Sequence, residues 1–144
     1  MPQLGLAIHK HRFLDALEKS LKENNEILYG WYSVEEKNGL LYEKGMDVLF
    51  TGTVKFTDSE HKTNRVIQYV NGLMDGFFLH WGLGDELQSE YFYVKDKQHG
   101  RCLDWDGQPY EGRIRYDRNF EHGKCLSEKA YNLDGTFRET FFDS

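Results

Sequence analysis

Proline is scarce in this chain. Only 2 of its 144 residues are proline, whereas aromatic residues make up 15% of the sequence. A disordered chain is therefore excluded, because disordered segments are rich in proline and poor in aromatic residues. Aromatic side chains are enriched in β-strands, and this length is usual for one domain with its own core. We expect a β-rich protein that forms a single domain over residues 1–144.

Cysteine is equally scarce. The two cysteines, Cys102 and Cys125, each lie two residues after a glycine of a repeated pattern, Gly100 and Gly123. Equivalent positions in consecutive hairpins lie two strands apart, roughly 9–10 Å, which is too far for a disulfide in an unbroken meander. We expect both thiols to be reduced and to serve as small filler residues rather than as reactive groups.

Long apolar runs and an excess of basic residues are also missing. No run is long enough to span a bilayer, and the first residues lack the apolar core of a signal peptide. The formal net charge is −6, which disfavours nucleic acid and anionic membrane surfaces as partners. A cytoplasmic location is the expectation.

An internal repeat is the strongest pattern in the chain. Gly76 and Gly100 are 24 residues apart, and Gly123 follows 23 residues later. Each of these glycines is preceded seven residues earlier by a tyrosine and followed three residues later by a leucine. These residues are Tyr69, Tyr93 and Tyr116, with Leu79, Leu103 and Leu126. A fixed period in this range is the signature of a repeat architecture.

Two turn signals punctuate each repeat. The first set is Asp75-Gly76, His99-Gly100 and His122-Gly123, and the second is Gly84-Asp85, Asp106-Gly107 and Asp134-Gly135. Such pairs suit two-residue hairpin loops, because glycine adopts a positive φ without strain and histidine tolerates it. Between the turns the apolar residues alternate with polar ones, so that Ile67 shares a strand face with Tyr69 and Leu79 with Trp81. The pattern predicts an antiparallel meander with one hairpin per repeat.

The segment before the repeats has a different period. Phe13, Leu14, Leu17 and Leu21 recur at helical spacing, which predicts an amphipathic α-helix over residues 9–24. We expect this helix to pack on the sheet, with a partner-binding helix as the alternative. The remainder, about 27–142, is predicted to form the sheet, with a degenerate first copy around Gly52, a polar loop at 57–64 and a closing strand near the end of the chain. The predicted fold is mainly β: a single antiparallel meander with one N-terminal helix.

The sequence lacks the motifs of familiar catalytic sites. It has no P-loop, no nucleophile elbow and no Cys-x-x-Cys pair. His99 and His122 occupy the same repeat position as Asp75, so turn chemistry explains them better than metal ligation. Most carboxylates fall in turns or on the outward faces of strands. We therefore predict no enzymatic activity, no cofactor, no metal site and no small-molecule substrate; an enzyme with an unrecognised site is the alternative.

The repeat resembles the MORN-repeat variant. The matching pieces are residues 50–56, 67–76, 93–100 and 116–123, and the resemblance covers about 40–137. It is similar to the version found in bacterial antitoxins of the YwqK type and in immunity proteins of polymorphic toxin systems. The resemblance implies MORN-like hairpin repeats and a protein that binds another protein. MORN-like sheets also serve as scaffolds and lipid-associated modules, so the fold alone leaves the role open.

The combination of resemblance, acidic charge and missing catalytic motifs predicts an immunity protein or antitoxin. It would bind and occlude a cognate bacterial toxin domain, with nuclease and ADP-ribosyltransferase domains as candidates; the alternative is a MORN-like scaffold or interaction module. Aromatic residues with acidic neighbours are typical of binding surfaces. The predicted partner-binding residues are Trp81, Asp104, Trp105, Asp106, Tyr110 and Glu111, with the loop at 57–64 as a possible extension. Reversing the charges of Asp104, Asp106 and Glu111 together is expected to weaken inhibition while the fold persists.

Overall fold

A computed structural model describes residues 28–30, 32–60, 63–82, 87–106 and 113–142 of the chain. The predicted helix over 9–24 lies outside these residues, as do Tyr110 and Glu111. The described part contains no helix long and apolar enough to cross a membrane. It contains twelve strands. They are β1 (Leu28–Tyr29), β2 (Val34–Lys37), β3 (Leu40–Glu43), β4 (Gly52–Asp58), β5 (Thr63–Val70), β6 (Leu73–Trp81), β7 (Leu87–Val94), β8 (Lys97–Gln98), β9 (Gly100–Trp105), β10 (Ile114–Glu121), β11 (Lys124–Tyr131) and β12 (Phe137–Phe141).

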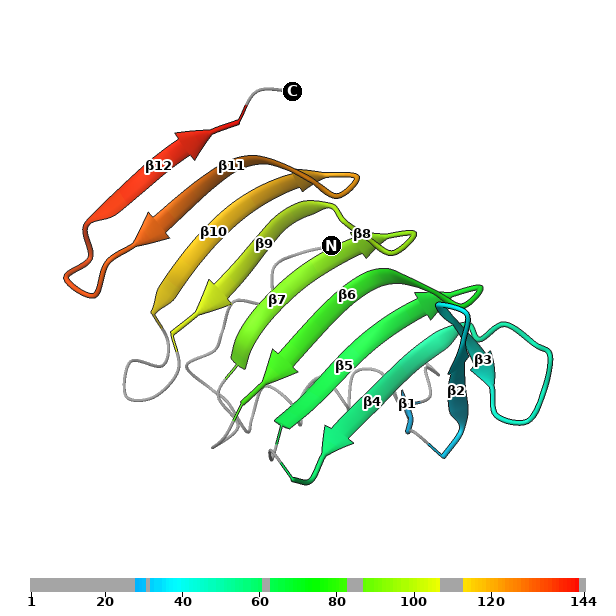
Figure 1. Ribbon diagram of the computed structural model, residues 1–144. Helices are drawn as coiled ribbons and strands as arrows, with labels where there is room; N and C mark the ends of the chain where they lie inside the picture. Colours follow the sequence, from blue (N-terminus) through cyan, green and yellow to red (C-terminus); the bar gives the residue numbers. More distant parts are fainter. Residues whose placement is uncertain (1–27, 31, 61–62, 83–86, 107–112, 143–144) are drawn as a thin grey trace.

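One long sheet dominates the architecture. Its ten strands follow the order β1-β4-β5-β6-β7-β9-β10-β11-β12, with β8 paired to β7, and all pairs from β4 onward are antiparallel. The short β1 pairs parallel to β4. In Figure 1 the strands from β4 to β12 lie side by side as a curved ribbon. The predicted meander is therefore confirmed, including a closing strand, β12.

A separate two-stranded hairpin, β2–β3, lies at the β4 end of the long sheet (Figure 1). It packs on one side of β4 to β6 through a cluster that includes Val34, Leu41, Phe50, Val54 and Ile67. Because successive side chains of a strand point to opposite faces, Val66 belongs to the other side of the sheet. A second cluster fills that side, formed by Val66, Phe77, Leu79, Trp81, Leu87, Leu103 and Trp105. The central strands therefore bury side chains on both faces.

The hairpin turns differ in part from the prediction. The β5–β6 turn is Asn71-Gly72, with φ of 48° and 81°, whereas Gly76 lies inside β6. The next turn is Lys95-Asp96, and Gly100 begins β9. Two adjacent residues with positive φ form the tightest hairpin loop, and asparagine before glycine is its strongest sequence signal. The predicted turns at Asp75-Gly76 and His99-Gly100 are therefore wrong.

The predicted turns later in the chain are confirmed. His122-Gly123 joins β10 to β11 with φ of 46° and 87°, and Gly135 has a φ of 88° between β11 and β12. Gly123 is thus a turn residue, whereas Gly76 and Gly100 are strand residues, so the third repeat copy is not structurally equivalent to the first two. The polar segment 57–64 is also shorter as a loop than predicted, because Thr57 pairs with Asn64 at the ends of β4 and β5.

Tyr69 connects the β2–β3 hairpin cluster to the sheet. Its ring meets Phe50 and Phe56 edge-on, with centroids 6.3 and 6.5 Å away. Burial raises the pKa of its hydroxyl from 10.0 to about 12. The folded protein therefore keeps this proton at a pH where the unfolded chain has lost it, and its contribution to stability, intact below pH 10, is lost as the pH rises to about 12.

This proton linkage gives a test by alkaline denaturation. Urea unfolding at pH 8 and pH 11.5 is expected to show a smaller loss of unfolding free energy in Tyr69→Phe than in the wild type. The difference should reach up to about 2 kcal/mol, because two pKa units correspond to about 2.7 kcal/mol and partial exposure reduces the effect. An identical alkaline loss in both proteins would show that Tyr69 carries no linkage.

Candidate partner-binding face

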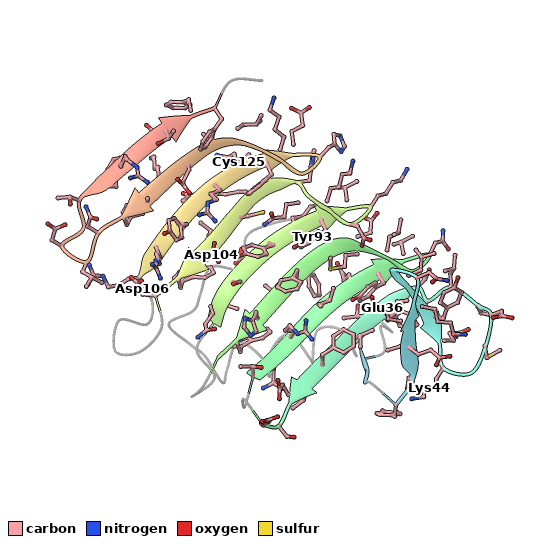
Figure 2. The ribbon with its side chains drawn as sticks, in the orientation of Figure 1. Glu36, Lys44, Tyr93, Asp104, Asp106 and Cys125 are labelled. Atoms are coloured by element: carbon pink, nitrogen blue, oxygen red, sulfur yellow. The ribbon has the colours of Figure 1, made fainter. Side chains whose placement is uncertain are left out.

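The side of the sheet that carries the β2–β3 hairpin continues past it over β7, β9 and β10. We call this region the open face and define it by Tyr91, Tyr93, Asp104, Tyr116 and Arg118, which are all partly exposed. Figure 2 labels Tyr93 and Asp104, which lie over neighbouring strands of the sheet. The register explains the grouping, because Ser89 stands opposite Asp104 and Asp104 stands opposite Tyr116. Residues directly opposite one another in a sheet point to the same face.

An open hollow of about 380 Å³ lies on this face. Its lining comes from three strands: Gln88, Ser89 and Tyr91 of β7, Asp104 and Trp105 of β9, and Arg115, Tyr116 and Arg118 of β10. A register shift between Ile114 and Tyr116 marks a bulge in β10. Bulges re-aim side chains, and this one accounts for an Arg115 that lines the hollow beside its chain neighbour Tyr116.

Asp104 is the centre of a hydrogen-bond network. Its carboxylate accepts hydrogen bonds from the hydroxyl of Tyr91 and from that of Ser89, the latter at 3.2 Å. The guanidinium of Arg118 lies 3.6 Å away on the other side. Burial raises the pKa of Tyr91, and the hydrogen bond to Asp104 raises it further, so the hydroxyl remains a donor at neutral pH. Asp104 is therefore held in place from two neighbouring strands.

Arg118 extends the network to β11. Its Nε donates to Glu128 at 2.6 Å, and Glu128 in turn lies 3.9 Å from Arg138 on β12. The guanidinium carbon of Arg118 also stands 4.2 Å from the ring centre of Tyr116, within cation–π range. Arg115 approaches the same ring at 5.3 Å. A polar surface fixed in this way presents side chains that lose little conformational entropy when a partner binds.

A row of aromatic rings joins the open face to the region beside the hairpin. Tyr91 stacks on Phe78 with centroids 5.6 Å apart, and Tyr93 meets Phe78 at 5.8 Å. Burial raises the pKa of Tyr93 as well. Tyrosine and arginine are the residue types most often found at the energetic centres of protein interfaces. The open face therefore has the composition of a protein-binding surface.

The same face was tested for catalytic geometry. His80, Ser89 and Asp104 stand in one cross-strand row, but the serine lies between the other two residues. Its hydroxyl donates to Asp104, and no hydrogen bond joins His80 to Ser89 within the part of the chain that the structure describes. A nucleophilic serine needs the histidine as its proton acceptor, and the aspartate must orient that histidine. The row is not such a triad.

Metal ligation has no support in the described ranges, where no three His, Cys, Asp or Glu side chains gather closely enough to hold an ion. His99 and His122 do meet at neighbouring hairpin tips, with ring centres 4.8 Å apart. Nδ1 of His99, however, accepts a hydrogen bond from the backbone N–H of His122 at 3.3 Å. The pair thus ties two hairpin tips together. Cys102 and Cys125 both occur as free thiols.

The predicted partner-binding residues do not form one exposed face. Trp81 is 0% exposed and Trp105 is 6% exposed, and both belong to the buried cluster on the opposite side of the sheet from Asp104. Asp106 follows β9, and its backbone N–H donates to the carbonyl of Arg113. Tyr110 and Glu111 are outside the described residues. Of the six, only Asp104 has a side chain that the structure places on the open face.

Several residues of the open face were missed from the sequence: Ser89, Tyr91, Arg115, Tyr116 and Arg118. Strand alternation alone separates Asp104 from its neighbours Leu103 and Trp105, and this signal could have removed the tryptophans from the predicted surface. The pairing of Asp104 with Ser89 and Tyr116 depends on the register between strands, which the sequence pattern did not specify. In comparisons with known proteins, no protein-family model and no curated protein matched this chain.

Proposed function

We propose that this protein is an immunity protein or antitoxin, built from MORN-like hairpin repeats, that binds a bacterial toxin domain in the cytoplasm and blocks it by occlusion. The observation that carries the proposal is the open face, where Tyr91, Tyr116, Arg118 and Asp104 are held in a fixed network around a hollow. Such a surface recognises a partner through shape and hydrogen bonds without chemical turnover. The net charge of −6 favours a basic partner and fast association with it.

The spacing of hairpin contacts supports the repeat interpretation. Backbone N–H groups at Gly72 and Asp96, 24 residues apart, donate to the carbonyls of Phe50 and Met74, which are also 24 residues apart. Gly123 continues the series by donating to Gln98 at 2.8 Å. Each hairpin tip is therefore bonded to the preceding one. Repeats that contact only their neighbours build extended binding surfaces of this kind.

The test begins with affinity capture of the tagged, full-length protein from its own cells. One stoichiometric partner is expected, whose expression alone stops growth and whose toxicity is relieved when both proteins are produced together. A protein that returns no partner, or many weak ones without toxicity, would contradict the antitoxin proposal and favour the scaffold alternative. Retention on lipid vesicles would point to a membrane-associated module instead.

A matched pair of substitutions on β10 tests the open face. Arg115 is exposed and lines the hollow, whereas Asn119 is exposed on the other side of the strand, next to Arg118 of the open face. Arg115→Ala is expected to weaken binding of the captured toxin about tenfold, the usual effect of removing a central arginine. Asn119→Ala is expected to change it by less than about twofold.

Calorimetric titration of the purified toxin with each variant measures both effects. Circular dichroism melting serves as the folding control, since both positions are exposed and neither substitution should shift the midpoint strongly. Equal affinity in wild type and Arg115→Ala would remove the hollow from the interface while leaving the antitoxin proposal standing.

A further inference from the structure

The outer edge of β12 is an unpaired strand edge. β12 ends the strand order of the long sheet and pairs with β11 alone among the described strands. In Figure 1 it is the outermost strand at the end of the sheet opposite to β4. An edge of this kind exposes a row of N–H and C=O groups that can bind another strand.

The backbone hydrogen bonds identify which groups point outward. The N–H of Phe142 donates to Leu126, and the carbonyl of Thr136 accepts from Asn132, so the even-numbered residues face β11. In an antiparallel pair these inward residues alternate with outward ones. The N–H and C=O groups of Phe137, Glu139 and Phe141 therefore point away from the sheet, and no described residue pairs with them.

The side chains of the same three residues share one face of β12. Phe137 is 53% exposed and Phe141 is 73% exposed, which is unusual for large apolar side chains on a paired strand. Glu139 lies between them, with its carboxylate 3.9 Å from Lys129 of β11. The edge therefore presents an apolar–acidic–apolar pattern at every second position.

This pattern argues against a second copy of the chain as the occupant. A two-fold axis through Glu139 is the only symmetric antiparallel arrangement that matches all three outward residues with outward residues. It would pair Phe137 with Phe141 of the other copy, but it would also place Glu139 directly opposite itself. Like charges directly opposite in a sheet are destabilising. The edge thus favours a strand from a different protein with a basic residue at the centre.

We propose that β12 is extended by a β-strand of the partner, added antiparallel, in which a lysine or arginine lies opposite Glu139 and apolar residues lie opposite Phe137 and Phe141. The inference rests on the proposed function and specifies the partner's chemistry: an apolar-x-basic-x-apolar strand, in keeping with a basic toxin domain. Main-chain hydrogen bonds supply the affinity in this mode of recognition, and alternate side chains supply the specificity.

The probe is the acetylated and amidated heptapeptide Thr-Val-Thr-Lys-Thr-Val-Thr, titrated into the full-length, isotope-labelled protein. Amide hydrogen exchange followed by NMR is expected to slow at Phe137, Glu139 and Phe141, while Arg138 and Thr140, already bonded to β11, change little. The same peptide with glutamate in place of lysine is expected to bind about two- to fivefold more weakly, the range of a cross-strand charge pair.

Two variants sharpen the test. Glu139→Lys is expected to reverse the peptide preference, so that the glutamate peptide binds better. Phe141→Pro removes an outward N–H while keeping every bond to β11, and it is expected to abolish protection by the peptide without unfolding the strand. No protection of the outward amides, an unchanged preference in Glu139→Lys, or a dimer that Phe141→Pro dissociates in sedimentation would overturn the proposal.

The captured toxin separates this inference from the proposed function. If Phe141→Pro leaves toxin affinity unchanged, the strand addition is refuted and the antitoxin role stands. If the peptides behave as expected but no toxin is captured, the antitoxin role fails and the edge remains a strand-binding site.

Discussion

Replacing Trp81 by alanine is expected to lower the free energy of unfolding by about 3–5 kcal/mol, the usual cost of removing a buried tryptophan. Trp81 is 0% exposed at the end of β6, and it packs with Leu79, Leu87 and Trp105. The neighbours belong to different strands, so they cannot close the space without moving the sheet. Urea denaturation followed by circular dichroism measures the change.

Tyr32 provides the matched control, because its aromatic ring is 81% exposed. Tyr32→Ala is expected to change the unfolding free energy by no more than about 0.5 kcal/mol. A loss below about 1 kcal/mol in Trp81→Ala would contradict the burial of this side chain. Trp81→Phe, which keeps most of the apolar volume, should remain folded and bind the partner with wild-type affinity, since Trp81 is not on the open face.

Replacing Gly72 by alanine is expected to destabilise the protein by about 3 kcal/mol. The residue has a φ of +81°, and a Cβ there would lie 2.9 Å from the carbonyl oxygen of Leu41. About 1 kcal/mol comes from the left-handed backbone, and the remainder comes from forcing apart two main-chain segments. Gly72 also donates to Phe50 and accepts from Leu41, so the strain falls on the contact between the β2–β3 hairpin and the sheet.

Gly39 separates the two contributions. Its φ is +79°, almost the same as that of Gly72, but a Cβ would meet nothing within 4 Å. Gly39→Ala is therefore expected to cost about 1 kcal/mol, the backbone strain alone. Thermal melts of both variants measure the difference, and equal losses would show that the Cβ contact with Leu41 contributes nothing.

Both substitutions act away from the open face. Gly72 lies at the β5–β6 turn beside the hairpin, and Trp81 lies in the cluster on the opposite side of the sheet from Asp104. Where these variants remain folded, their affinity for a partner is expected to be unchanged. Loss of binding by Arg115→Ala without loss of stability would have a different physical origin, the removal of a contact.

The two glycine-containing turns of the second repeat show where periodicity was insufficient. Residues 71–76 contain both Asn-Gly and Asp-Gly, and either suits a two-residue loop. Alignment of the glycines favoured Gly76, but the chain turns at Gly72 and uses Gly76, with a φ of 115°, inside β6. The choice depends on which register buries Ile67 and Leu79 together with their neighbours, and this is a property of the whole sheet.

The sequence alone determined that the chain is a meander of antiparallel strands, because the period of the repeat, the alternation of apolar residues and most of the turn residues are local features. It also determined that Leu79 and Trp81 share one face. Only the tertiary structure decided which face is buried and which residues meet across strands. Asp104 meets Tyr91, Ser89 and Arg118 through strand pairing, and Trp105, its neighbour in sequence, points into the opposite cluster. Local pattern fixes the direction of a side chain relative to its own strand, whereas the binding face depends on contacts between strands far apart in the chain.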